Sequence, residues 1–420
     1  MEYLSYGEFS ADLHKRQAGD RVPVQVSIEV TRRCPLDCLH CYNNLPMGDL
    51  QAKSRELSKE EHFRVLDELV EMGCFWILYT GGEIFARKDF LEIYTYAKRQ
   101  GFLITLFTNG TLISERIADY LAEWPPFSIE ITLYGRTRET YEALTAIPGS
   151  YDRCLRGIRL LKERNLPLKL KTVATQVNKH EIGAMRQFAE VELGVAFEMD
   201  GLINPRVDCS QSPLAVRLLP EEVVALDMQT RSGVSGYRRL LERCMEGPPN
   251  LARTETVYVC GGGMSSFAIN ADGEIGICVI SQQETFSVRN ASVKAIWEQS
   301  LRAVRERKRS RMTKCQHCRI QSVCGMCPAN GELENGDREA PVDFLCHVAH
   351  LRAMTIGIEV PEHGDCEFCE KEMRETLREQ ARRIQSREID VESWVGPQHA
   401  FPILNNSGPS LNGCGSCGGH

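Results

Sequence analysis

The chain has 420 residues, a formal net charge of −7 at pH 7, and 42% hydrophobic and 25% charged residues. This composition is that of an ordinary globular protein, and the length allows one large domain with one or two small ones. The negative charge argues against a general polyanion binder, so nucleic acid is not expected as a partner. No apolar run approaches the roughly 18 residues that a membrane span needs, and the N-terminus lacks a signal-peptide pattern. We therefore expect a cytoplasmic protein with no membrane partner.

The first half of the chain alternates short apolar runs with amphipathic stretches. The apolar runs predict strands at 24–30, 75–79, 103–108, 127–133, 168–174 and 195–198. The amphipathic stretches predict helices at 59–72, 91–100, 114–122, 151–164 and 181–192, and a further helix at 219–230 leads out of this region. Six strand-helix repeats favour a parallel α/β sheet, either barrel-like or doubly wound.

Three cysteines directly follow the first predicted strand, as the Cys-x3-Cys-x2-Cys run Cys34, Cys38 and Cys41. Three thiolates can hold three irons of a 4Fe-4S cube and leave the fourth iron for a small molecule. The alternative is zinc, because Cys-x2-Cys is half of a zinc ribbon, but a structural zinc needs four ligands and no fourth cysteine follows nearby. The run resembles that of the radical S-adenosylmethionine (radical SAM) superfamily. This resemblance implies a partial (β/α)6 TIM-like barrel and a 4Fe-4S cluster that reductively cleaves S-adenosylmethionine to a 5′-deoxyadenosyl radical.

A second motif, Thr80-Gly81-Gly82-Glu83, follows the second predicted strand. Both motifs therefore lie at carboxyl ends of strands, where (β/α) barrels place their active sites. Glycines let the backbone approach a ligand, and an acid complements an ammonium group. The motif resembles the Gly-Gly-Glu motif of the superfamily, which implies that it binds the amino group of the methionine moiety.

Further contacts to S-adenosylmethionine are implied by the same resemblance, from Tyr42, Asn109, Thr132 and Lys171. Three of the four have a plainer interpretation. Tyr42 can pack the loop against the barrel rim, Asn109-Gly110 is a generic turn signal, and Lys171 can be a solvated lysine on a strand edge. No residue that handles the hydrogen atom is assigned.

A cysteine-rich module follows residue 250, where short irregular segments cannot build much apolar core without metal. Its cysteines are Cys260, Cys278 (as Gly273-x4-Cys278), the run Cys315-x2-Cys318-x5-Cys324-x2-Cys327, and Cys346. The pattern resembles the SPASM domain, which implies two auxiliary 4Fe-4S clusters. Cys260, Cys278 and Cys327 would bind the first, and Cys315, Cys318, Cys324 and Cys346 the second. The central run taken alone also suits a single zinc ion.

The pattern departs from the family at one point, because two residues instead of three separate Cys324 from Cys327. The first auxiliary cluster also has only three obvious ligands. Three alternatives remain for its fourth iron. A distant cysteine such as Cys209 or Cys244 binds it, a group other than cysteine binds it, or it is open to a substrate thiolate.

Two more cysteine pairs lie outside this pattern, Cys366-x2-Cys369 and Cys414-x2-Cys417. Together they can form a tetrahedral zinc or a further iron-sulfur site, and the second pair lies in a Gly/Ser-rich tail that resembles a mobile arm. Cys74 and Cys154 are expected to be small buried hydrophobic residues. Alternating charges at 370–390 predict an exposed helix.

The predicted division of the chain is 1–23 N-terminal segment, 24–235 radical SAM core, 236–254 linker, 255–355 SPASM domain and 356–420 tail. The resemblance implies an enzyme that matures a peptide or protein by crosslinking, oxidation or decarboxylation, with flavodoxin or ferredoxin as reductant. A porphyrin-modifying enzyme of haem biosynthesis is the second interpretation. A non-catalytic zinc or iron-sulfur scaffold is the third.

Overall fold

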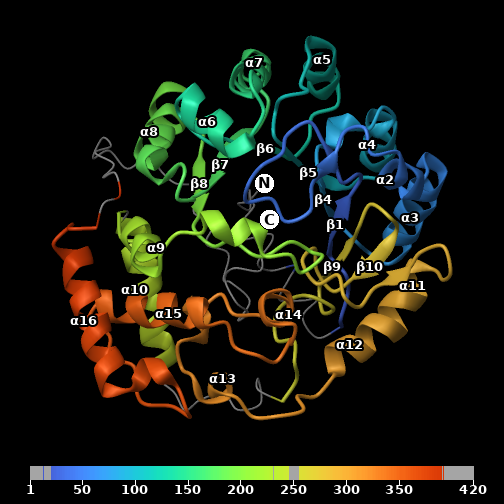
Figure 1. Cartoon of the computed structure of the whole chain (residues 1–420). Coiled ribbons are helices and arrows are strands. Elements are labelled where there is room, and N and C mark those ends of the chain that lie inside the picture. Colours follow the sequence, from blue (N-terminus) through green and yellow to red (C-terminus); the bar gives the residue numbers. More distant parts are fainter. Residues whose placement is uncertain (1–12, 14–19, 230, 246–254, 390, 392–420) are drawn as a thin grey trace, which may run out of the picture.

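The computed structural model describes residues 13, 20–229, 231–245, 255–389 and 391. Strands curve through one half of the molecule with helices on their outer side, and the cysteine-rich C-terminal part fills the other half (Figure 1). Successive strands of the first half are parallel neighbours. They are β1 (Gln25–Glu29), β4 (Trp76–Thr80), β5 (Leu103–Thr108), β6 (Ser128–Thr132), β7 (Leu168–Val173) and β8 (Phe197–Asp200). The expected partial (β/α)6 barrel is confirmed.

The outer helices cover the strands with amphipathic faces. They are α2 (Leu50–Arg55), α3 (Lys59–Glu71), α4 (Phe90–Arg99), α5 (Glu115–Glu123), α6 (Arg138–Thr145), α7 (Ser150–Glu163) and α8 (Ile182–Gln187), which continues as a π-helical turn (Phe188–Glu192). In α3 a capping box between Ser58 and Glu61 fixes the first turn. Val65, Leu66 and Leu69 are buried at helical spacing, so this helix packs one apolar face onto the sheet.

The C-terminal part adds three strands to the same sheet. They are β9 (Ser266–Ile269), β10 (Glu274–Gly276) and β11 (Phe286–Ser287). β9 runs parallel to β1, and β10 is antiparallel to both β9 and β11. The sheet order is therefore β11-β10-β9-β1-β4-β5-β6-β7-β8, and a separate pair, β2 (Arg33–Cys34) and β3 (Leu45–Pro46), closes the first cysteine loop. The hairpin that precedes Cys278 is thus a continuation of the barrel sheet.

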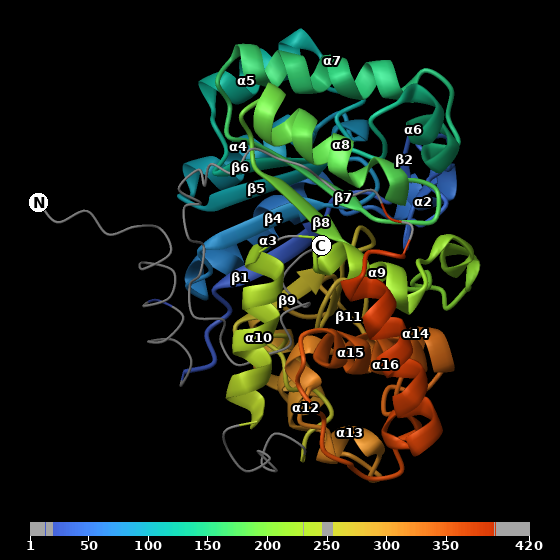
Figure 2. The same cartoon turned by 90° about the vertical axis from the view of Figure 1, so that its left-hand side faces the viewer.

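Helices make up most of the remaining C-terminal part. They are α9 (Pro220–Asp227), α10 (Arg231–Met245), α11 (Val293–Ala295), which continues through a π-helical turn (Ile296–Leu301) into α12 (Arg302–Glu306), α13 (Lys314–His317), α14 (Pro328–Asn335), α15 (Asp343–Thr355) and α16 (Lys371–Gln385). α15 packs against α9, α10 and α16. Figure 2 shows these helices stacked below the sheet.

The helix at 370–390 was expected to be exposed, but Leu377, Ala381 and Ile384 of α16 are buried against its neighbours, so that expectation is wrong for one face. α10 crosses the predicted domain boundary at 235, and the division of the chain into domains stays a prediction. Cys74 and Cys154 are buried, as expected.

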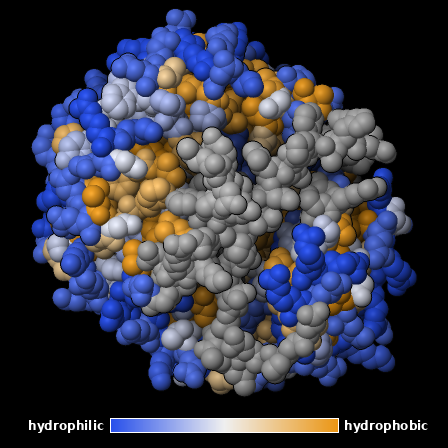
Figure 3. Space-filling view, turned by 180° about the vertical axis from the view of Figure 1, so that it is seen from behind, coloured by the Kyte–Doolittle hydropathy of each residue, from blue (hydrophilic) through white to orange (hydrophobic). Residues whose placement is uncertain are grey.

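The rear face of the molecule mixes hydrophilic residues with separate hydrophobic patches (Figure 3). Within the part of the chain that the structure describes, no helix combines the length and the apolar character needed to traverse a bilayer.

A buried glycine in α7 gives a test of the packing. A Cβ at Gly157 would lie 2.2 Å from the carbonyl oxygen of Gly110, in the turn that follows β5. Helix propensity alone favours alanine by about 1 kcal/mol. Because backbone cannot yield to the new methyl group, we expect Gly157→Ala to lower the free energy of unfolding by about 1–3 kcal/mol in urea denaturation.

The matched control is Gly48→Ala, since a Cβ there meets no atom within 4 Å. We expect this variant to unfold within about 0.5 kcal/mol of the parent protein. A Gly157→Ala protein as stable as the parent would show that α7 does not pack closely on the turn.

Candidate active site and metal centres

The first cysteine loop starts at the carboxyl end of β1 and is held on two sides. At its base, Leu45 N donates to the carbonyl oxygen of Arg32 at 2.8 Å. On the other side, the backbone amides of Asp37 and Leu39 donate to carbonyl oxygens at the end of α6, at 3.0 Å each. α6, which the sequence analysis did not predict, therefore supports the loop.

The three thiols of this loop face one cavity of about 580 Å³. Cys34 and Cys38 are buried and Cys41 is half-buried. Burial raises the pKa of all three thiols, so ionised sulfurs need a cationic partner. No further cysteine is found among the described residues that line this cavity. Three converging sulfurs with no fourth one fit a 4Fe-4S cluster with one open iron.

Two charged residues that the sequence analysis missed hold the loop by hydrogen bonds. Glu29, buried at the end of β1, accepts hydrogen bonds from Tyr42 Oη at 3.1 Å and from Asn43 Nδ2 at 2.5 Å. Arg206 donates to the carbonyl oxygen of Cys41 at 3.1 Å and to Asn44 Oδ1 at 2.8 Å. Each is a single charged residue, and the two lie far apart in the sequence, so no sequence motif indicates their role.

The pair Gly81-Gly82 allows the ends of two strands to approach each other closely. A Cβ at Gly81 would lie 2.1 Å from the carbonyl oxygen of Thr31, and one at Gly82 would lie 2.4 Å from that of Arg32. Gly82 N also donates to the Thr31 carbonyl oxygen at 2.7 Å. Only glycine permits this contact, which sets the end of β4 directly against the start of the cysteine loop.

Glu83 lies behind the cavity wall and is not among the described residues that line the cavity. Its carboxylate accepts hydrogen bonds from Thr108 Oγ1 at 2.7 Å, from Asn109 N at 2.8 Å and from Phe85 N at 3.2 Å. Burial raises the pKa of Glu83 to about 7. The structure therefore gives this side chain a positioning role toward the Thr108-Asn109 turn.

The other predicted cofactor contacts line the cavity: Gly81, Gly82, Tyr42, Asn109, Thr132 and Lys171. Asn109 Nδ2 donates to Cys34 Sγ at 3.4 Å, so this amide acts on a cysteine of the loop. Lys171 Nζ lies 3.5 Å from Glu130 Oε2, and burial lowers the pKa of Lys171 to about 8. Lys171 is thus a half-buried lysine that is paired with a carboxylate.

The second group of thiols lies in the C-terminal half. Cys315, Cys318, Cys324 and Cys346 line one cavity, with Cys324 and Cys346 close enough to share a hydrogen bond. Their elements are α13, the turn after it and α15. A 4Fe-4S cluster needs four cysteine sulfurs, and four line this cavity, so the residues fit the second auxiliary cluster.

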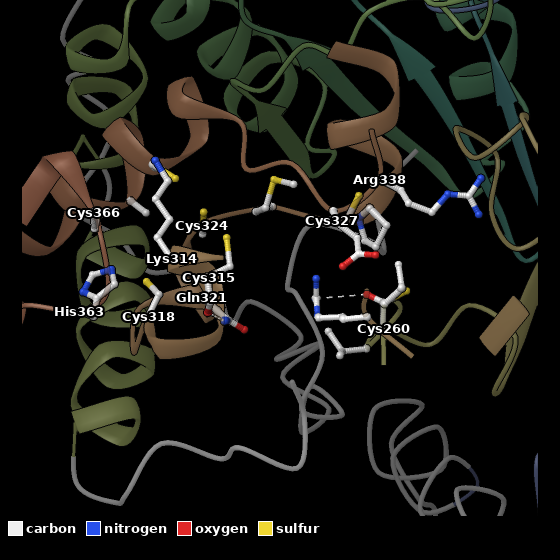
Figure 4. Close-up of a pocket in the computed structure, with 18 of the residues that line it drawn as sticks. Cys260, Lys314, Cys315, Cys318, Gln321, Cys324, Cys327, Arg338, His363 and Cys366 are labelled. Atoms are coloured by element: carbon white, nitrogen blue, oxygen red, sulfur yellow. Dashed lines mark hydrogen bonds between the residues drawn. The ribbon is translucent and has the colours of Figure 1, made fainter. Parts of the chain in front are cut away.

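Cys327 separates from its neighbours in sequence. Figure 4 shows it with Cys260 at the opposite end of the cavity from Cys315, Cys318 and Cys324. Cys278 is half-buried near Cys260, and burial raises the pKa of its thiol to about 11. Despite the shortened spacing, Cys327 therefore lies at the same end of the cavity as Cys260, and its assignment to the first auxiliary cluster stays a prediction.

Each of the two distant cysteines considered as a fourth ligand has a side-chain partner in the structure. Cys209 Sγ accepts from Gln283 Nε2 at 3.4 Å, and Cys244 Sγ lies 2.9 Å from Ser322 Oγ. Neither lines the cavity with Cys260 and Cys327, but Cys278 does not line it either, so the fourth ligand stays open. Cys414 and Cys417 lie outside the described residues.

A parallel partial barrel that carries three cysteines on one loop and a Gly-Gly turn on the next defines the class of enzymes that cleave S-adenosylmethionine at an open iron. The sequence matches the Radical SAM superfamily over residues 28–189 and an iron-sulfur cluster-binding SPASM domain over residues 260–319. The chain therefore carries a radical SAM domain followed by a SPASM domain. Its cofactors are S-adenosylmethionine, the 4Fe-4S cluster that reduces it to a 5′-deoxyadenosyl radical, and two auxiliary 4Fe-4S clusters.

Relatives with two kinds of substrate resemble this chain. An AdoMet-dependent heme synthase of Oleidesulfovibrio alaskensis is 26% identical, over 75% of this chain and 85% of its own. A PqqA peptide cyclase of Rhodopseudomonas palustris is 27% identical, over 79% and 88%. Streptococcus suis SuiB, in its structure bound to the precursor peptide SuiA, superposes with a TM-score of 0.60 at 16% identity over 80% of each chain, which shows the shared fold.

The hydrogen bond from Asn109 to Cys34 gives a test of the core site. Hydrogen bonds to cluster sulfurs stabilise the more negative, reduced state, so their loss lowers the reduction potential. Asn109→Asp removes the donor and adds negative charge, while it keeps the Oδ1 acceptor of Thr111 N and Oγ1. We expect a more negative midpoint potential for the core cluster in a titration followed by electron paramagnetic resonance.

The control is Asn165→Asp, which makes the same atomic change at an exposed residue between α7 and β7, at the other end of the strands. Its core potential should equal that of the parent protein. An unchanged potential in Asn109→Asp would separate Asn109 from the cluster.

The separation of Cys327 from Cys324 gives a second test. We expect Cys324→Ser and Cys327→Ser each to lose about four irons, but from different auxiliary clusters, because their sulfurs face opposite ends of the cavity. Iron and sulfide analysis with paramagnetic resonance of the remaining clusters distinguishes the two losses. The same remaining signals in both variants would place the two cysteines on one cluster.

Proposed function

We propose that this enzyme modifies a peptide or protein and not a porphyrin. The observation that carries the proposal is the charge of the cavity beside the core cysteines. Besides His40, the described residues that line it include two basic ones, Lys171 and Arg352, and three acidic ones, Glu198, Asp200 and Asp227. A porphyrin with several carboxylates needs an excess of cations around it, and this wall has an excess of anions.

Both basic side chains, those of Lys171 and Arg352, also form ion pairs with carboxylates. Arg352 Nε lies 2.7 Å from Asp227 Oδ2, and both residues are buried, so separating them is costly. Lys171 is held by Glu130 on the neighbouring strand, as described above. The heme synthases among the relatives keep porphyrin modification as the second candidate, but the wall offers little to a polyanionic macrocycle.

The backbone beside the cavity suits an extended peptide. Among the described strands, β8 pairs with β7 and is the last strand of the sheet order. Seven consecutive residues, from Glu198 to Asn204, line the cavity, so main chain as well as side chains borders the space. A strand edge offers amide and carbonyl groups at regular spacing, which an extended peptide can pair with.

Each group of residues has a role in this proposal. Cys34, Cys38 and Cys41 would hold the core cluster, which supplies the radical chemistry when S-adenosylmethionine binds. Gly81 and Gly82 would leave room for the methionine moiety, and Tyr42, Asn109, Thr132 and Lys171 would border the rest of the cofactor. The cluster needs a one-electron donor, and we propose a small redox protein such as flavodoxin or ferredoxin. The free thiols of the described residues suit the reducing cytoplasm.

The test compares two substrate classes on the anaerobically reconstituted full chain. One is a synthetic peptide that corresponds to any short open reading frame found beside the gene, and the other is iron-coproporphyrin III. With S-adenosylmethionine and dithionite, we expect the peptide to increase 5′-deoxyadenosine release and to lose hydrogen or carbon dioxide by mass spectrometry. The porphyrin should stay unchanged.

The control protein carries Cys34→Ala, Cys38→Ala and Cys41→Ala and should release no 5′-deoxyadenosine with either compound. Decarboxylation of the porphyrin propionates by the parent enzyme would replace our proposal by the haem-pathway alternative. A parent enzyme that releases no 5′-deoxyadenosine under any condition would support a scaffold instead.

A further inference from the structure

A group of four buried side chains lies beside the second auxiliary site and belongs to neither iron-sulfur pattern. It consists of His350 on α15, His363 on the segment after it, and Cys366 and Cys369 at the short turn before α16. One ligand atom from each residue lies within 4.8 Å of those of the other three, and all four residues are at most 7% exposed. Figure 4 shows His363 and Cys366 at the same end of the cavity as Cys318.

The distances within the group match a single tetrahedral ion. His350 Nε2 lies 3.7 Å from Cys366 Sγ and 3.9 Å from Cys369 Sγ, and His363 Nδ1 lies 3.4 Å from Cys369 Sγ. Zinc bonds of about 2.0–2.3 Å in a tetrahedron place neighbouring ligand atoms about 3.3–3.8 Å apart. The side chains therefore need only small movements to reach ligand geometry.

The other ring nitrogen of His350 has a partner that prepares the site. His350 Nδ1 lies 2.7 Å from the carbonyl oxygen of Cys346, to which it can donate only when it carries the proton. That tautomer leaves the Nε2 lone pair facing the two sulfurs, an arrangement common in metal-binding histidines. His363 Nδ1 also lies 2.9 Å from the carbonyl oxygen of Pro361, a contact that an ion bound at this nitrogen would replace.

We propose that His350, His363, Cys366 and Cys369 bind one structural zinc ion. Binding replaces the two thiol protons, which are released to solvent, by Zn²⁺. The two thiolates and the divalent ion then sum to zero charge, so the complex suits a buried site that would not accept an isolated ion. Four protein ligands leave no open position, which is the arrangement of a structural and not a catalytic zinc.

A two-iron cluster with the same ligand types fits less well. In such a cluster the histidines bind one iron and the cysteines the other. His350 Nε2 would then lie away from both sulfurs, but here it is nearly equidistant from them. A pairing of Cys366 and Cys369 with the tail cysteines, which the sequence left open, is not needed because two histidines complete the set.

The site would fix a helix that carries a cluster ligand. His350 follows Cys346 by four residues on α15, so the two side chains lie one turn apart on one face. The proposed zinc would tie this face to the segment that leads into α16. Phe368, also buried, stacks on His350 with ring centroids 5.4 Å apart and closes the site.

The first experiment measures zinc and iron per chain in the full protein, purified and reconstituted without oxygen, by plasma mass spectrometry. We expect about one zinc in the parent protein. Cys366→Ser with Cys369→Ser should lose that zinc and keep the parent iron content. The matched control, Cys414→Ser with Cys417→Ser, changes the other Cys-x2-Cys pair in the same way and should keep both metals.

X-ray absorption at the zinc edge tests the site without relying on the folding of the double variant. The parent should show two sulfurs at about 2.3 Å and two nitrogens at about 2.0–2.1 Å, and His363→Cys should show three sulfurs and one nitrogen. The proposal is overturned by a parent protein without zinc or with another ligand set. Loss of iron instead of zinc in the Cys366/Cys369 variant, or loss of zinc in the tail variant alone, also overturns it.

Discussion

The contact on which the active site depends is the one between two strand ends that meet without a Cβ between them. Gly81 and Gly82 bring the end of β4 against the carbonyl oxygens of Thr31 and Arg32, where the cysteine loop begins. The contact sets the distance between the three thiols and the wall that would receive the methionine moiety. A larger residue at either position would push the loop outward, because backbone on both sides leaves no flexible group to move.

Around this contact, polar side chains form hydrogen bonds to different parts of the cysteine loop or of the turn beside it. Glu29 holds Tyr42 and Asn43, Arg206 holds the backbone of Cys41, and Glu83 holds the turn that aims Asn109 at Cys34. Buried carboxylates are costly unless their oxygens are satisfied, and these are satisfied by the elements that they position. The loop is therefore held in place by hydrogen bonds from the protein's own side chains, and residues held in this way lose less entropy when a ligand binds.

The sequence was sufficient for the barrel strands and for the grouping of the cysteines, because alternating apolar runs and close cysteine spacings are local signals. β5 has the predicted bounds, and the other barrel strands shift by one or two residues. α15 was missed because it is buried almost all round, so it has no amphipathic period. The role of Glu83 and the meeting of His350 with Cys366 depend on tertiary contacts between distant segments, which no local pattern carries.

The parallel pairing of β9 with β1 also makes the enzyme a single folding unit. β1 carries the cysteine loop at its end and has β4 on one side and β9 on the other. If translation stopped after the barrel, the hydrogen-bonding edge of β1 would be open to solvent and to other chains. An unprotected strand edge of this kind promotes self-association. A shortened protein that retains every ligand of the core cluster would therefore still be prone to aggregate.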